Sequence, residues 1–173
     1  VRLVRHRAEA MQGAAPEGLG GMAAILGLPD EAVLRVCEEA AQGEVLEAAN
    51  FNAPAQVVIA GHKGALQRGI GLAKARGAKR GVMLPMSVPC HCSLMRPAAE
   101  SLTARLADVQ VAASAVPVIH NAAVASHAES AAIKDALARQ VCSPVRWVGT
   151  VRYLLDQGVT HVIECGPGKV LAG

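Results

Sequence analysis

Residues 52–61 read Asn52-Ala53-Pro54-Ala55-Gln56-Val57-Val58-Ile59-Ala60-Gly61, a turn signal followed by a short apolar run. The Asn-Ala-Pro triplet favours a turn, and a run rich in β-branched residues at 56–61 is typical of a buried strand. A strand is expected at 44–50, before the turn. A helical pattern at 63–76 follows the strand and ends at Gly77. The turn is therefore expected to join two neighbouring strands.

The same pattern extends on both sides of these strands. We expect a strand at 21–27, a helix that begins at Pro29-Asp30 and ends at Gly43, and a fourth strand at 80–86. The resulting order, β-α-β-β-α-β over about 65 residues, is the split, ferredoxin-like pattern.

The flanking sequence alternates helix and strand, which is typical of a three-layer α/β architecture. The expected elements are a helix at 1–12, a Gly- and Pro-rich linker at 13–21, a helix at 94–106, a strand at 116–121, helices at 130–141 and 144–157 with Pro144 in the first turn of the second, a buried strand at 160–164, and a helix that begins at 167. Because helices are expected at both ends, we expect the 173 residues to be part of a longer chain.

Composition excludes several classes of protein. Apolar residues make up 52% of the chain, enough to bury a core. A net charge of +3, with single Trp and Tyr residues, argues against a nucleic-acid partner. Five cysteines at irregular spacing predict free thiols in a reducing cytoplasm. No apolar run reaches membrane-spanning length and no signal peptide is present, so we expect a cytoplasmic protein that does not bind membranes.

A histidine follows the expected strand 80–86, in Ser87-Val88-Pro89-Cys90-His91-Cys92. A turn after a strand is where a fold can present a proton-transfer group, although a lone histidine is more often structural. Zinc binding is not expected, because side chains one residue apart in extended chain point to opposite sides and no second Cys/His pair has ligand spacing. The same geometry argues against Cys90 as a nucleophile for His91. The 173 residues contain no Gly-x-Ser-x-Gly motif.

An arginine interrupts the apolar face of the expected helix 1–12. That face comprises Val1, Leu3, Val4, Ala8 and Met11, and the opposite face Arg2, Arg5, His6 and Glu9. Arg7 lies between Leu3 and Met11 at four-residue spacing. A guanidinium there needs an anionic partner, unless only its stem is buried and its head reaches solvent. The sequence leaves both readings open.

Two further features have simple structural readings. Gly166-Pro167-Gly168-Lys169 lacks the spacing and the Ser or Thr of a phosphate loop, so its glycines are expected to serve a tight turn. The basic cluster of Lys74, Arg76, Lys79 and Arg80 suits the C-terminal end of a helix dipole, and it could also contact an acidic protein.

Five blocks of sequence together resemble one enzyme family. They are Val1-Arg2-Leu3-Val4…Arg7…Met11-Gln12, Asn50-Phe51-Asn52…Gln56 to Gly61, Ser87 to Cys92, Arg139-Gln140…Ser143 to Trp147, and Glu164 to Leu171. In this order they resemble the malonyl-CoA:acyl carrier protein transacylases of bacterial fatty-acid synthesis, and the match runs from end to end.

This resemblance implies an α/β fold in which part of a large subdomain similar to an α/β hydrolase carries an inserted ferredoxin-like small subdomain. The large subdomain would comprise residues 1–17 and 88–173, and the insert residues 18–87. The family works without a cofactor or metal, so none is expected here. A monomer is expected, with malonyl-CoA as substrate and acyl carrier protein as partner.

The resemblance also implies roles for three residues. His91 resembles the base that activates a serine, Gln140 the residue whose backbone carbonyl orients that imidazole, and Arg7 the arginine that binds malonyl's free carboxylate. The family's Gly-His-Ser-Leu-Gly nucleophile segment is expected before Val1, so we expect these 173 residues alone to be inactive. Two alternatives remain: an acyltransferase domain of a modular polyketide or fatty-acid synthase, and a non-catalytic fragment that binds carrier protein.

Overall fold

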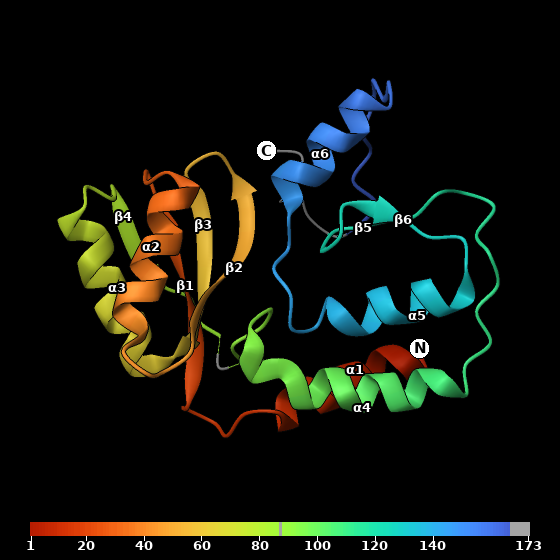
Figure 1. The fold of residues 1–173 in the computed structure, drawn as a ribbon, viewed down its shortest axis with the longest axis horizontal. Helices are drawn as coiled ribbons and strands as arrows, with labels where there is room; N and C mark the ends of the chain where they lie inside the picture. The colour runs from red at the N-terminus through yellow and green to blue at the C-terminus, as the bar shows by residue number, and fades with distance from the viewer. Residues whose placement is uncertain (87, 167–173) are drawn as a thin grey trace.

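The computed structural model describes residues 1–86 and 88–166 and has the α/β fold expected from the sequence (Figure 1). Its elements are α1 (Arg2–Gly13), β1 (Gly20–Leu26), α2 (Asp30–Ala41), β2 (Leu46–Ala53), β3 (Gln56–His62), α3 (Lys63–Ala75), β4 (Arg80–Met83), a 3-10 turn η1 (Ser93–Met95), α4 (Arg96–Ala107), β5 (Ile119–His120), β6 (Ala125–Ser126), α5 (Ser130–Arg139) and α6 (Trp147–Asp156).

The four strands β1 to β4 form one antiparallel sheet in the order β2-β3-β1-β4. Their order along the chain, with α2 and α3 between them, is the β-α-β-β-α-β order that the sequence predicts. The two helices pack against one face of the sheet (Figure 1). Ile25, Val33, Ile59 and Leu66 are fully buried between the helices and the sheet. Burial of such side chains contributes about 1.5–3 kcal/mol each.

Strand β2 departs from the predicted bounds. The sequence placed a strand at 44–50 and a turn at 52–54, but β2 begins at Leu46 and continues to Ala53. Two register shifts against β3 absorb the extra residues. The turn is confined to Pro54 and Ala55, and Ala55 has a positive φ of 59°. The Asn-Ala-Pro signal was thus misplaced by about two residues, because the bulged strand outlasts the apolar run.

Strand β4 is shorter than the predicted 80–86 and ends at Met83. The amide of Leu84 still donates to the carbonyl of Met22 at 2.9 Å. Pro85 has no amide hydrogen to extend the ladder, and the amide of Met86 turns back to the carbonyl of Leu84 at 2.8 Å. His91 therefore lies in a separate turn eight residues beyond the strand, rather than directly at its end.

The second face of the sheet is covered by the chain around His91. Cys92 is fully buried against that face, and three positions later Met95 is fully buried in a second core formed with α1, α4 and α5. The members of this second core are Met11, Met95, Ala98, Leu102, Leu106, Ala138 and Val141. In Figure 1, α1 and α4 run side by side below α5. The segment 92–95 thus joins the sheet to the helices.

Helix α1 buries only part of the apolar face that the sequence predicts. Val1 and Val4 are 102% and 70% exposed, whereas Met11 is buried and Leu3 packs against the second core. His6 was assigned to the solvent face, but it is half-buried and its Nε2 lies 3.1 Å from Ser101 Oγ on α4. Since α1 packs through the i, i+3, i+4 row that includes His6, the apolar face inferred from Val1 and Val4 was wrong.

The predicted helix 144–157 begins three residues later, at Trp147. Val145 instead pairs with β2: its amide donates to the carbonyl of Ala49 and its carbonyl accepts from the amide of Phe51, both at 2.8 Å. This parallel bridge keeps Val145 beside β2 and out of the helix. Pro144 therefore precedes the helix instead of opening it.

Near the C-terminal end, two predicted strands are reduced or absent. Of the strand expected at 116–121, only Ile119 and His120 pair, with β6; Pro117 cannot donate to a ladder. The buried strand expected at 160–164 does not form, and Val162 and Ile163 are 70% and 83% exposed. A strand needs a neighbouring strand to satisfy its backbone groups, and none of the strands formed by the described residues lies beside this segment. The helix expected from 167 lies outside the described residues.

The other predicted helices are found with small shifts: α5 ends at Arg139 and not at 141, and the helix expected at 94–106 is the η1 turn followed by α4. None of the helices built by the described residues has the length and apolarity needed to cross a lipid bilayer.

Candidate active site

His91 has an unusual backbone conformation. Its φ is +61°, in the left-handed region that non-glycine residues seldom adopt. Its amide donates to the carbonyl of Val141 at 3.3 Å, which ties the turn to the chain after α5. Buried Cys92 follows it directly. Residues held in such conformations need support from their surroundings and often occur at functional sites.

A hydrogen bond to the backbone orients the imidazole of His91. Its Nδ1 lies 2.9 Å from the backbone carbonyl oxygen of Gln140. A carbonyl can only accept, so Nδ1 carries the hydrogen and, in the neutral ring, Nε2 carries the lone pair. The structure thus brings His91 and Gln140 together, and it leaves Nε2 as the nitrogen able to take a proton.

Burial lowers the pKa of His91 below its usual value of 6.5. The carbonyl of Gln140 acts in the opposite direction, the positive charge of Arg7 lowers the pKa further, and the backbone of Ser143 raises it. A general base must be deprotonated at working pH. The direction of this shift favours the neutral imidazole near pH 7.

Arg7 lies on α1 close enough for its charge to act on both His91 and Cys90. The residue is half-buried, and its Nε is fully shielded from solvent without a hydrogen-bond partner among the described residues. A shielded guanidinium N–H with no acceptor carries a desolvation cost, which an anion could remove. Of the two readings left open by the sequence, the unpartnered Nε supports the one in which Arg7 needs an anionic partner.

Glu47 was not singled out in the sequence, yet its carboxylate reaches the turn that follows His91. Its Oε2 accepts from the amide of Ser93 at 2.9 Å and its Oε1 from the hydroxyl of Ser93 at 2.7 Å. A charge pattern cannot reveal such a pair, because 46 positions separate the two residues. Only the packing of β2 beside the turn brings them together.

The two thiols that flank His91, those of Cys90 and Cys92, have little thiolate character. Burial raises the pKa of Cys90 against a smaller opposing effect of Arg7, and it raises the pKa of Cys92 and of Cys37 to about 12. Among residues 1–86 and 88–166, no three His, Cys, Asp or Glu side chains are placed to hold a metal ion. The candidate chemistry therefore centres on the imidazole.

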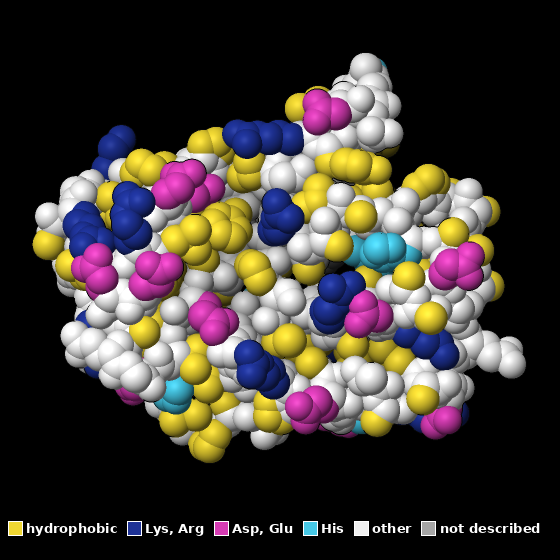
Figure 2. Space-filling model, viewed as in Figure 1, with side chains coloured by type: hydrophobic (Ala, Val, Ile, Leu, Met, Phe, Trp, Pro, Cys, Tyr) yellow, Lys and Arg dark blue, Asp and Glu magenta, His cyan; other side chains and the backbone are white. Residues whose placement is uncertain are grey.

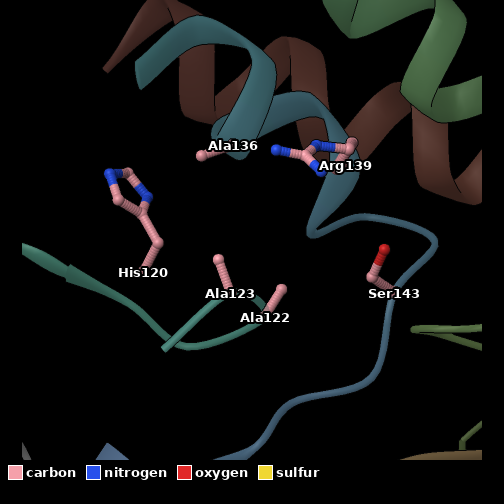
Figure 3. Close-up of a pocket in the computed structure, with 6 residues that line it drawn as sticks. All are labelled: His120, Ala122, Ala123, Ala136, Arg139 and Ser143. Atoms are coloured by element: carbon pink, nitrogen blue, oxygen red, sulfur yellow. The ribbon is translucent and has the colours of Figure 1, made fainter. Parts of the chain in front are cut away.

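A small pocket opens beside the Gln140 segment (Figure 3). Its lining residues are His120, Ala122, Ala123, Ala136, Arg139 and Ser143. The ring of His120 also contacts that of His127, with centroids 5.3 Å apart. Sequence reasoning missed this pocket, and the position of His120 at the end of an expected strand was its only signal. His91 and Arg7 do not line it.

The surface over α2 and α3 mixes both signs of charge (Figure 2). Within the basic cluster noted from the sequence, Arg76 forms an ion pair with Glu39 of α2. Nearby, Arg68 pairs with Glu44 at 2.7 Å. The Arg76–Glu39 pair supports the structural reading of the cluster for Arg76.

Comparison with known proteins gives a consistent result. No protein-family model matches the chain. The malonyl CoA-acyl carrier protein transacylase of Salmonella typhimurium is 52% identical over 173 residues, which are 100% of this chain and 56% of that protein. The crystal structure of an acyl-carrier-protein S-malonyltransferase from Burkholderia pseudomallei is 57% identical, with a TM-score of 0.96 over 99% of this chain and 56% of the other.

A third similar structure is a complex, described as a type II polyketide acyl-carrier protein with its malonyl-transacylase. It is 46% identical with a TM-score of 0.97, and the match covers 99% of this chain and 55% of that chain. The chain therefore spans slightly more than half the length of the proteins it matches. The resemblance inferred from five blocks of sequence is confirmed: over its whole length, this chain is closely similar to malonyl-CoA–acyl carrier protein transacylases.

Proposed function

We propose that the protein transfers a malonyl group from coenzyme A to the phosphopantetheine thiol of acyl carrier protein through a serine acyl-enzyme. The serine would come from a segment outside these 173 residues. His91 acts as the base, the Gln140 carbonyl orients it, and Arg7 binds the substrate carboxylate. The observation that carries the proposal is the 2.9 Å contact between His91 Nδ1 and the Gln140 carbonyl, with Arg7 close by.

The imidazole serves both half-reactions. In the first, Nε2 takes the serine proton while the serine oxygen attacks the thioester carbon; the carbon–sulfur bond then breaks and the proton passes to the thiolate of coenzyme A. In the second, Nε2 takes the proton of the phosphopantetheine thiol, whose sulfur attacks the acyl-enzyme. The bond from the acyl carbon to the serine oxygen breaks, and the proton returns to that oxygen. A neutral carbonyl partner fixes the tautomer without adding a negative charge near an anionic substrate.

Arg7 gives the reaction its acyl selectivity. A guanidinium offers two parallel N–H donors to a carboxylate, and this pairing is strong where water is excluded. Malonyl has that carboxylate and acetyl does not. The shielded, unpartnered Nε supports this role, since a bound carboxylate would supply the missing acceptor.

The arrangement of subdomains belongs to the same proposal. Residues 1–17 and 88–173 would form part of a large subdomain similar to an α/β hydrolase, and residues 18–87 an inserted ferredoxin-like subdomain. The order of the four-stranded sheet supports the second assignment. We further propose a monomer in the cytoplasm, where five free thiols remain reduced. The similar complex with a polyketide carrier protein favours polyketide synthesis as a second setting for the same chemistry.

The proposal is tested by acyl transfer in the full-length protein. With labelled malonyl-CoA and acyl carrier protein, His91→Ala should reduce transfer by about 10²–10⁴-fold, the contribution typical of a general base. The control His161→Ala removes an exposed histidine and should leave transfer unchanged. Transfer that persists in His91→Ala would overturn the assignment. In the 173-residue chain alone, mass spectrometry should find no malonyl adduct, and an adduct there would contradict a nucleophile outside it.

A further inference from the structure

The carboxylate of Glu47, on strand β2, accepts both polar hydrogens of Ser93, two residues after His91. Its two oxygens are 2.9 Å from the Ser93 amide nitrogen and 2.7 Å from the Ser93 hydroxyl. We propose that Glu47 is a positioning residue for the His91 imidazole and that it acts through Ser93. This inference rests on the proposed role of His91 and adds a residue to it.

Four connections form a closed frame around His91. The His91 amide and ring bind the carbonyls of Val141 and Gln140. Farther along that segment, Val145 pairs with β2 through two hydrogen bonds of 2.8 Å. On the other side of His91, Ser93 binds Glu47, which is also on β2. Strand β2 thus forms the third side of a triangle whose other sides are the histidine turn and the chain after α5.

A carboxylate is well suited to the place that Glu47 occupies. Ser93 opens the η1 turn, which continues directly into α4, and the first amides of such an element have no partner within it. No side chain caps η1 from its own N-cap residue, Cys92. Glu47 supplies the acceptor from another element, and its negative charge interacts favourably with the positive N-terminal end of the helix dipole. Because each oxygen binds a different donor, the contact restricts both the backbone and the side chain of Ser93.

This restraint matters because the conformation of His91 is not self-supporting. A left-handed backbone at a non-glycine residue persists only where neighbouring contacts hold it. The Val141 contact holds the backbone amide of His91 itself, while the burial of Cys92 and the Ser93–Glu47 contact hold the chain that follows. Without Glu47 the turn can relax, and the direction in which Nε2 points toward the hydroxyl or thiol whose proton it takes then changes. Misplacement by about 1 Å can reduce a rate by about 10²-fold.

The test measures kcat and KM for malonyl transfer in three variants of the full-length protein. Glu47→Ala should lower kcat by about 10- to 100-fold and change KM for malonyl-CoA by less than about twofold. Glu47→Gln keeps one acceptor oxygen and should recover part of kcat. Ser93→Ala keeps the amide donor and should lose only a few-fold. The acid limb of the kcat–pH profile should also move in Glu47→Ala. Without the contact to Ser93, the His91 imidazole is no longer held in one fixed environment.

Glu44 provides a matched control on the same unit. Its carboxylate pairs with Arg68 and not with the histidine turn, so Glu44→Ala should leave kcat and the pH profile unchanged. If Glu47→Ala does not fold, the kcat values of Glu47→Gln and Ser93→Ala carry the test, and both should lie below the wild-type value. Wild-type kcat and an unshifted pH profile in all soluble Glu47 and Ser93 variants overturn the inference. Should His91→Ala itself remain active, the proposed function fails instead, so the two failures are distinguishable.

Discussion

Arg7 on α1 lies near enough to His91, in the turn before η1, for its positive charge to lower the pKa of that imidazole. Burial is the larger cause, and the Gln140 carbonyl opposes both. The residue proposed to hold the substrate anion therefore also disfavours a charged base. Binding of a carboxylate by Arg7 would cancel this effect and make the ring a stronger base when substrate is present.

This coupling predicts a shift in the titration of His91. Arg7→Met removes a nearby positive charge, so the pKa of His91 should rise toward its ordinary value and the ring should begin to protonate at higher pH. An NMR titration of the imidazole measures this directly. Arg5→Met alters an exposed arginine on the same helix and should leave the midpoint in place. A midpoint that does not move in Arg7→Met would show that the two groups are uncoupled.

Stability should depend on pH through the same histidine. In the folded protein the pKa of His91 is lowered, so between that pKa and 6.5 the unfolded chain binds more protons. The free energy of unfolding should then fall as the pH falls through 6.5, and the loss is complete below the folded pKa. His91→Gln should reduce this dependence in denaturant titrations at pH 5 to 7. An equally steep dependence in the variant would assign it to other groups.

Acyl selectivity should follow Arg7. In the full-length protein, Arg7→Ala should reduce the preference for malonyl over acetyl transfer by about 2–4 kcal/mol, or about 30- to 900-fold. Arg7→Lys should restore only part of the preference, because an ammonium lacks the planar pair of donors. The ratio of the two kcat/KM values is the measurement. An unchanged ratio in Arg7→Ala would exclude the carboxylate contact.

Alkylation should distinguish the cysteines by burial. Cys165 is exposed and should react with iodoacetamide first, whereas Cys37 and Cys92, each with a pKa of about 12, should stay unmodified in the folded chain. Peptide mapping by mass spectrometry after timed exposure measures the order. Denaturant provides the control, since all five thiols should then react. Early labelling of Cys92 would contradict its burial.

Two glycine substitutions should have opposite effects. A Cβ at Gly61 would lie 2.0 Å from the backbone oxygen of Val45, which cannot move without disturbing β2, so Gly61→Ala should destabilise the fold by about 1–3 kcal/mol or more. Gly71 is exposed on α3 with open space around its Cα, and Gly71→Ala should stabilise by about 0.5–1 kcal/mol. Thermal or chemical unfolding compares both with the parent chain.

The sequence predicted the sheet unit well because its signals are local. Apolar runs, the glycines at 43 and 77 and the Pro54 turn fix the order of β1 to β4 with α2 and α3 between them. The predictions failed where pairing partners are distant. Val145 joins β2 and so delays α6, while residues 160–164 have no strand beside them among the described residues. Neither the presence nor the absence of such a distant partner can be predicted from a short stretch of sequence.

The site shows the same division. His91 and Arg7 were singled out from their positions in the sequence, Gln140 came from family resemblance alone, and the structure places His91 in contact with Gln140 and near Arg7. Their roles stay predictions until transfer is measured. Glu47 gave no signal, since a glutamate in a strand usually faces solvent. The buried side of α1 was also misjudged, because partners on α4, and not the spacing of Val1 and Val4, determine which face packs.

The bridge between Asn50 and Val145 also bears on solubility. Strand β2 is an edge strand of its sheet, and the unpaired amides and carbonyls of an edge strand can pair with strands of other molecules. Val145 occupies the amide of Phe51 and the carbonyl of Ala49, so one short stretch of chain blocks the middle of that edge. A change that frees this stretch would expose a template for intermolecular pairing, and aggregation would then accompany the loss of the site.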